Sequence, residues 1–238
     1  MFARTTEAPV LLIGAAHVVD LGGPLRTTLG GRVLDGVAVE LDAERAEALM
    51  GGSARTGGRA DVPIFARLWA LVQKRLGAEI GGGSPGDEMK VAVTVARERN
   101  LPVFLIDDPI RATLLELVRT MPFKERVALF VGAFVGLFVP AKVVEHEMDR
   151  YTENPDEFAQ EIRRASPTIA RVLLDDRNEH MADRLASLRG QGYGRLAVVV
   201  GDAHLPGLSA ALGRRSIPVE AIPFRQLREV RAPSSSPS

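Results

Sequence analysis

The chain has 238 residues, of which 46% are hydrophobic and 25% are charged, so it can form one domain with a substantial core. Its 30 basic and 30 acidic residues cancel, which gives no general attraction to nucleic acid or to an anionic membrane. The absence of cysteine excludes disulfides, iron–sulfur clusters and thiol nucleophiles, so any metal ion would be held by histidine and carboxylate side chains.

The first predicted strand covers residues 9–13 and is followed by Gly14-Ala15-Ala16-His17. Its apolar run is short and is preceded by Glu7, which favours a strand over a secretory signal peptide. We therefore expect a cytoplasmic protein.

Four more strands are predicted along the chain, and all five are short and almost continuously apolar. This composition is typical of parallel strands that are covered by helices on both faces. The four segments are residues 36–41, 102–106, 195–200 and 217–222.

Helical patterns fill the remaining sequence. They cover residues 42–50 with Asp42 as the N-cap, 63–79, 87–99 and 108–119, and the whole of the region from about 122 to 190, whose last helix starts at Pro167. Strands that alternate with helices predict a single α/β domain over residues 1–231, with a mainly parallel sheet and a helical insert at about 122–190. Residues 232–238 are rich in serine and proline and are predicted to be disordered.

The most hydrophobic segment is residues 127–139. A membrane-spanning helix needs about 20 apolar residues, and Pro140 and Lys142 end this run well short of that length, so we expect no transmembrane span. A buried helix is favoured over a helix that lies on a partner or on a membrane surface.

Gly-x-x-His occurs twice, as Gly14 to His17 and as Gly201 to His204, each time directly after a predicted strand. The chain has only four histidines. Because ligands bind at the carboxyl edge of an open parallel sheet, both imidazoles are expected at a functional site. The alternative is that each motif is a plain strand-to-loop turn with a structural histidine, and the repetition favours function.

Other ionisable residues also follow strands. If these groups face one crevice, they must be paired, hydrogen-bonded or metal-bound, because burying an unpaired charge costs several kcal/mol. Glu40 is either a buried carboxylate held by Arg45 or a helix N-terminus, or a metal ligand or base. Glu88 lies in the first turn of a predicted helix, where the helix dipole alone favours an acid. The strand-end groups are Glu40 and Asp42 with Arg45, Asp107 and Asp108 with Arg111, and Asp202 with His204.

Six motifs, in this order, resemble the TraB/PrgY family, which belongs with the TIKI, GumN and ChaN/erythromycin-esterase-like proteins. The resemblance covers nearly all of residues 9–225. The motifs are Leu-Leu-Ile-Gly-Ala-Ala-His17, Glu40-Leu-Asp42-x-x-Arg45, Gly86-Asp87-Glu88-Met89, Phe-Leu-Ile-Asp107 with Arg111, Asp175-x-Arg177-Asn178-x-x-Met181 and Val-Val-Val-Gly-Asp-Ala-His204-x-Pro-Gly.

The resemblance implies a ChaN-like α/β fold and a metal site formed by His17, Glu40 and His204 for a divalent ion such as Mn, Co, Zn or Fe. It implies that Glu88 is a fourth ligand or the general base. The arginines of the crevice, which would pair with carboxylates or hold an oxyanion, are then Arg45, Arg111 and Arg177.

The family's proposed activity is metal-dependent peptide hydrolysis in the TIKI branch, so the first hypothesis is a metallohydrolase that acts on a peptide or small-molecule substrate through an activated water. The second is a regulatory protein without catalysis, which binds or sequesters a signalling peptide, as in the pheromone-shutdown branch. In that case the apolar helix at 127–139 would contact a membrane partner or a second copy of the chain. A third hypothesis, hydrolysis of a non-peptide ester, rests on analogy with the erythromycin-esterase relatives alone.

Overall fold

A five-stranded parallel sheet forms the centre of the molecule, in the order β3-β2-β4-β1-β5. The structure is a computed structural model, and it describes residues 8–15, 21–51, 86–136 and 155–230. Every strand lies where the sequence predicts one, and the α/β class is confirmed. The strands are β1 (Val10–Ala15), β2 (Gly36–Val39), β3 (Val103–Leu105), β4 (Leu196–Gly201) and β5 (Val219–Ile222).

The register brings the two Gly-x-x-His strands side by side. β1 pairs with β4 so that Ala15 lies opposite Gly201, and β2 pairs with β4 so that Val39 lies opposite Val199. Since all the strands are parallel, the segments that follow β1, β2, β3 and β4 leave the sheet at one edge. This carboxyl edge is where the sequence predicts the functional residues.

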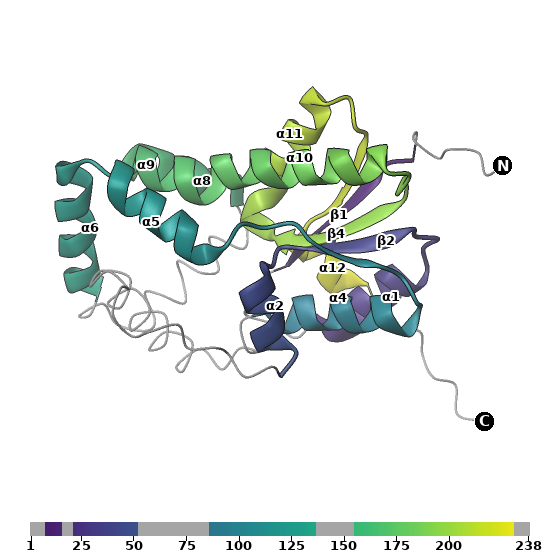
Figure 1. Cartoon of the computed structure of the whole chain (residues 1–238). Helices are drawn as coiled ribbons and strands as arrows, with labels where there is room; N and C mark the ends of the chain where they lie inside the picture. The colour runs from purple at the N-terminus through teal and green to yellow at the C-terminus, as the bar shows by residue number, and fades with distance from the viewer. Residues whose placement is uncertain (1–7, 16–20, 52–85, 137–154, 231–238) are drawn as a thin grey trace.

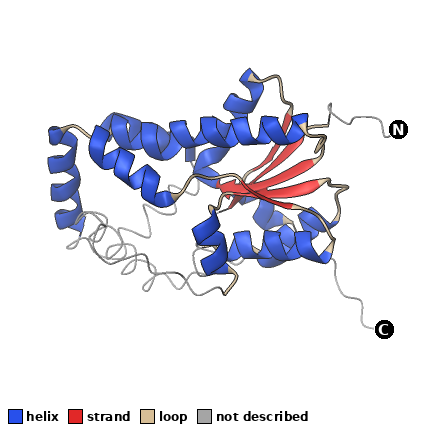
Figure 2. Ribbon diagram, viewed as in Figure 1, coloured by secondary structure: helices blue, strands red, loops and turns tan. Residues whose placement is uncertain are grey.

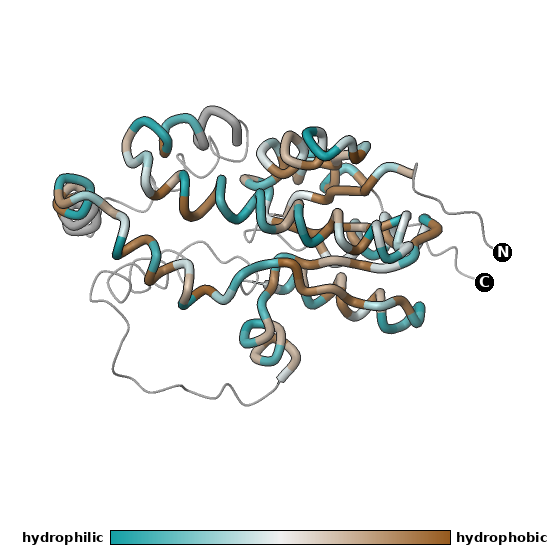
Figure 3. The backbone as a smooth tube through the Cα atoms, turned by 45° about the horizontal axis from the view of Figure 1, so that its top comes forward, coloured by the Kyte–Doolittle hydropathy of each residue, from teal (hydrophilic) through white to brown (hydrophobic). Residues whose placement is uncertain are grey.

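Helices cover both faces of the sheet (Figure 1). The helices α1 (Gly22–Gly30), α4 (Asp87–Glu98) and α12 (Phe224–Glu229) lie on one face, and α10 (Asp176–Gly190) and α11 (Leu205–Arg214) lie on the other. Alternate residues of each strand enter different cores. Leu11 and Ile13 pack with the first group of helices, whereas Leu12 packs with the second. The burial of β1, β2 and β4 on both faces accounts for their apolar sequences, and Figure 3 shows hydrophobic backbone segments at the centre of the molecule.

The helices near the site lie where the sequence predicts them, with the exception of one helix, α1. α2 (Ala43–Leu49), α4 and α5 (Ile110–Thr120) were expected, and Asp42 is the N-cap of α2 as predicted. α1 was not expected, because its sequence contains three glycines and a proline. Its Leu25 and Leu29 are fully buried, so tertiary packing outweighs its poor helix propensity. The helix predicted at 63–79 lies outside the described residues.

The predicted helical insert is helical wherever the structure describes it. It contains α6 (Phe123–Gly136), α8 (Pro155–Ala165), α9 (Pro167–Ala170) and α10, and a π-helical turn, Arg171–Asp175, joins the last two. With α5, the first three of these extend beyond the carboxyl edge of the sheet (Figure 2). π-Helical turns occur often at functional sites, and this one leads directly to Arg177.

The apolar helix was expected to be buried, and this is wrong for the residues whose exposure is known. Val127 and Val131 of α6 are 46% and 53% exposed, and Phe123 is 78% exposed. The first turn of α6 is held by Glu125, whose carboxylate accepts hydrogen bonds from Ser166 and Thr168, and the helix lies at the end of the molecule that is far from the sheet (Figure 1). Residues 137–139 lie outside the described part. None of the described helices has the length and hydrophobicity needed to cross a bilayer.

Candidate functional site

Four ionisable side chains converge at the carboxyl edge of the sheet. Glu40 follows β2, Asp107 follows β3 and His204 follows β4, while Arg177 comes from the first turn of α10. These side chains lie at most 12% exposed. Three of the four members therefore lie at strand ends, on the edge where the rule for parallel sheets places ligand-binding groups.

Arg177 is the centre of the cluster. Its Nε and Nη2 donate to the two oxygens of Asp107 at 3.0 and 2.5 Å, which is a bidentate ion pair. Nη2 also donates to Glu40, and Nη1 donates to the carbonyl oxygen of Leu173 at 3.1 Å. Burial alone would lower the pKa of Arg177, but the hydrogen bonds and charges of Asp107 and Glu40 raise it above its usual value. The guanidinium is thus a permanent buried cation.

Glu40 remains ionised despite its burial. Its Oε2 accepts the backbone N–H of Gly201 at 2.7 Å, and its Oε1 accepts a hydrogen bond from Arg177. Burial by itself would raise the pKa of Glu40, but His204, Arg177 and the Gly201 amide together lower it well below its ordinary value.

The imidazole of His204 is held from one side by Asn178. Its Nδ1 lies 2.8 Å from Asn178 Oδ1, and because this oxygen can only accept, Nδ1 carries the hydrogen. In the neutral ring the lone pair is then on Nε2, which lies 3.4 Å from Glu40 Oε1 and 3.2 Å from Arg177 Nη1. A Cβ at Gly207 in α11 would overlap the Asn178 amide, so glycine at this position makes room for the partner of the histidine.

Arg45 extends the cluster toward α2. Its Nε donates to Asp42 Oδ2 at 2.8 Å, and its Nη2 donates to Asp107. Asp107 is therefore shared between two arginines. Burial by itself would raise the pKa of Asp107, but these guanidinium groups lower it. Three carboxylates, two guanidinium groups and one imidazole nearly balance in charge.

Three other residues were predicted for the site. Arg111 is exposed on α5, and no hydrogen bond or ion pair connects it to the cluster within the described ranges. Glu88 is buried in the first turn of α4. His17 lies outside the described residues, two positions after Ala15.

Asp202 has a structural role, although its position after β4 suggests the crevice. Its Oδ1 accepts the backbone N–H of Phe224 at 2.8 Å and occupies the space that a Cβ of Gly14 would need. Asp202 thereby joins α12 to the ends of β1 and β4. This close contact explains why the first Gly-x-x-His motif has a glycine at position 14, where any larger residue would overlap Asp202.

One residue of the cluster, Asp107, and one residue that contacts it, Asn178, were not predicted as site residues. Asp107 was identified as a strand-end carboxylate without a role, and Asn178 was named only as part of a family motif, also without a role. The signal for Asp107 was its position after β3, as for Glu40. The motif around Asn178 gives no chemical role to this residue, because its contact with His204 depends on the packing of α10 against α11.

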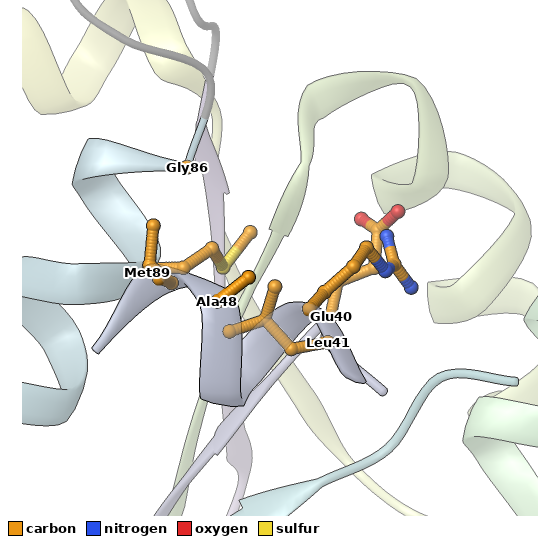
Figure 4. A pocket seen from close by; sticks show the side chains of 7 residues that line it. Glu40, Leu41, Ala48, Gly86 and Met89 are labelled. Carbon is orange, nitrogen blue, oxygen red and sulfur yellow. The ribbon is translucent and has the colours of Figure 1, made fainter. Parts of the chain in front are cut away.

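A cavity of about 420 Å³ opens beside Glu40 (Figure 4). Glu40 and Arg45 are the charged residues of its described lining. The rest of the described lining is Leu41, Ala48, Leu49, Gly86 and Met89, from α2 and the beginning of α4.

Glu40 and His204 have the donor types that bind a divalent ion. Glu40 Oε1 and His204 Nε2 are an oxygen and a nitrogen donor 3.4 Å apart, and two ligands of a tetrahedral ion with bonds of about 2.0–2.2 Å lie about 3.3–3.6 Å apart. The hydrogen bond to Nδ1 is the usual support of a metal-binding histidine. Within the described ranges no three histidine or acidic side chains form a metal-binding group, and the Arg177 guanidinium contacts both donors. The pair fits an ion in type and separation, with Arg177 as its competitor.

The fold and the site define an α/β protein with a buried histidine–carboxylate–arginine cluster at the carboxyl edge of a parallel sheet. The sequence matches the TraB/PrgY/gumN family over residues 3–220, so the chain belongs to this family, as its motifs predict. It is similar to an uncharacterized protein of Methanocaldococcus jannaschii, with 32% identity over 218 residues. The alignment covers 87% of this chain and 54% of the relative, so the chain spans about half the relative's length.

Proposed function

We propose that this protein is a metal-dependent hydrolase that cleaves a peptide amide bond. The observation that supports the proposal most is the pair of Glu40 Oε1 and His204 Nε2, which are 3.4 Å apart at the carboxyl edge of the sheet. Asn178 holds the imidazole so that Nε2 is directed toward Glu40. Such an arrangement has the donor types and the supporting hydrogen bond of a catalytic metal site.

In this proposal Glu40, His204 and His17 hold the ion. A bound divalent ion would supply a water of lowered pKa and polarise the substrate carbonyl. Glu88 would accept the proton of that water. Arg177 would donate to the oxyanion that develops on the substrate, because its guanidinium already points at the Glu40 and His204 atoms.

One observation favours the alternative of a binding protein without catalysis. Arg177 neutralises Glu40 and Asp107 without an ion, and in the described part of the chain no buried side-chain polar atom lacks a hydrogen-bond partner. A cluster that is complete in itself can serve as the rigid wall of a peptide-binding crevice. In this alternative the protein sequesters a signalling peptide and leaves it intact.

Elemental analysis and peptide cleavage separate the two functions. Protein purified without added metal should contain about one equivalent of Mn, Co, Zn or Fe, and a chelator should lower its melting temperature. His204→Ala and His17→Ala should abolish metal-stimulated cleavage of a mixed peptide pool, detected by mass spectrometry. The matched control is His180→Ala, since His180 is 51% exposed and its Nδ1 contacts Asp108 instead of the cluster.

Loss of cleavage in both histidine variants, with folding intact by circular dichroism, would support the hydrolase. Wild-type cleavage rates in both variants would end it. A metal-free protein whose stability is indifferent to chelator would favour the binding alternative.

A further inference from the structure

The cavity beside Glu40 has a chemical character that the proposed function does not use. Apart from Glu40 and Arg45, the side chains of its described lining are apolar, and they belong to Leu41, Ala48, Leu49 and Met89. Arg45, Ala48 and Leu49 lie three and four positions apart on α2, so they share the helix face that looks across to α4. Most of the described wall therefore comes from α2 and the beginning of α4, and α2 is tied to the cluster through Arg45.

Both charged groups of the described lining already have partners. Glu40 accepts hydrogen bonds from Arg177 and from the Gly201 amide, and Arg45 donates to Asp42 and Asp107. A charged ligand group that entered the cavity would lose its hydration and find no unpaired charge on the described lining to compensate it. An uncharged, apolar group has no such cost.

The position and the size of the cavity limit what can bind. Glu40 lines the cavity and is also a member of the cluster. A side chain that fills the cavity would therefore place the backbone of its peptide beside the cluster. The volume of about 420 Å³ lies near the lower end of the range of about 300–1,000 Å³ for small-ligand pockets. It can accept an apolar side chain together with neighbouring backbone.

We propose that this cavity is a side-chain subsite that selects peptides with a large apolar residue next to the bond that lies at the Glu40–His204 pair. The inference deepens the proposed function and rests on it for the position of the bond. Ala48 is the residue that determines the size of the subsite, because it is exposed on α2 and faces the cavity with the smallest side chain of the apolar wall.

The test uses a set of fluorescent peptides with a Gly/Ser background and one varied residue, which is Gly, Leu, Phe, Asp or Lys. Binding to the whole protein is measured by fluorescence anisotropy with EDTA present, and cleavage is measured separately with Mn²⁺ added. We expect the Leu and Phe peptides to bind at least about tenfold more tightly than the Gly, Asp and Lys peptides, as burial of a large apolar side chain predicts.

Ala48→Phe should fill the cavity and reduce this preference to less than about threefold. Ala43→Phe is the matched control, because Ala43 is also exposed on α2 but does not line the cavity, and it should keep the full preference. Ala48→Leu, a smaller addition, should reduce the affinity for Phe peptides more than the affinity for Leu peptides. Circular dichroism of each variant checks that the fold is retained.

The outcomes distinguish the subsite from the hydrolase. Apolar preference without any cleavage would retain the subsite and overturn the proposed hydrolysis. Cleavage that ignores the varied residue, or a preference that Ala48→Phe leaves unchanged, would overturn the subsite and retain the hydrolase. Failure of every peptide to bind and to be cleaved would overturn both.

Discussion

The two ends of the β2–β4 strand pair carry the same kinds of side chain in different arrangements. At the amino edge Asp35 precedes β2 and Arg195 precedes β4. The backbone N–H of Arg195 donates to Asp35 Oδ2 at 2.8 Å, and its Nε and Nη2 donate to Oδ1 at 3.1 and 2.5 Å. At the carboxyl edge Arg177 joins Glu40 and Asp107 beside His204.

The two edges differ in how many partners their charged groups have and in how exposed these groups are to solvent. The Asp35–Arg195 pair is self-contained, with the Arg195 side chain 40% exposed, and it holds two strands in register. In the carboxyl-edge cluster each charged group contacts several partners, and the cluster is shielded from water. It also contains His204, whose Nδ1 is hydrogen-bonded to the Asn178 side-chain carbonyl and whose Nε2 faces Glu40. Because water is largely excluded from this cluster, the electrostatic interactions of its charges are stronger than at the amino edge. Side chains of the same kinds therefore hold two strands together at one edge and can interact strongly with a ligand at the other.

The largest difference between the edges is expected in the cleavage rate when one carboxylate of each edge is neutralised in turn. Under the hydrolase proposal, Glu40→Gln removes an anionic ligand and should reduce metal-dependent cleavage by about 10³-fold, since stabilisation by a metal ion is worth several kcal/mol. Asp35→Asn should leave the cleavage rate unchanged, because Asp35 contacts only the amino edge. The measurement is kcat/KM on one peptide for both variants. Equal losses would show that the two edges do not differ in function.

The next largest difference is expected in the stability of variants at Arg177 and Arg195. Arg177→Met leaves Glu40 and Asp107 buried without their main counter-charge, and we expect a loss of about 3–5 kcal/mol in the free energy of unfolding. Arg195→Met should cost much less, because its pair is open to solvent. Urea denaturation of both variants measures the difference.

An added divalent ion sharpens this comparison. If Arg177 competes with an ion for Glu40 and His204, then Zn²⁺ or Mn²⁺ should raise the melting temperature of Arg177→Met by more than that of the wild type. A smaller rise in the variant would mean that Arg177 positions the two donors instead of competing for them.

The sequence predicts the central strands well because β1, β2 and β4 are buried and their runs are continuously apolar. The residues that follow the strands are located by the rule for parallel sheets, as Glu40 and His204 illustrate. Asp42 was predicted as an N-cap for an equally local reason, the side-chain bond to the Arg45 amide. These features depend on neighbours in sequence.

The features that sequence analysis missed depend on neighbours in space. Asn178 lies on a polar stretch of helix and contacts His204 only because Gly207 lets α11 approach it. α1 forms from a glycine-rich sequence because Leu25 and Leu29 enter the core. Asp202 turns away from the cluster because Gly14 and the Phe224 amide accommodate it.

The smallest effect is expected on the pH dependence of stability. The pKa values of Glu40, Asp107 and Asp35 are all lower in the folded protein than their ordinary values. A carboxyl group with a lowered pKa contributes stability above its unfolded pKa, about 4.3 for Glu and 3.9 for Asp, and this contribution is lost as the pH falls through the folded value. Unfolding then takes up protons, and each such group contributes a slope of up to about 1.4 kcal/mol per pH unit.

The free energy of unfolding should therefore fall between about pH 5 and pH 3. Glu40→Gln should remove more of this slope than Asp35→Asn, because solvent screens the half-exposed pair at the amino edge and the buried cluster keeps its carboxylates ionised to lower pH. Urea titrations at four pH values for the wild type and both variants measure the slopes. Identical slopes for the two variants would mean that burial at the carboxyl edge does not strengthen its ion pairs, and the contrast between the edges would then be one of geometry alone.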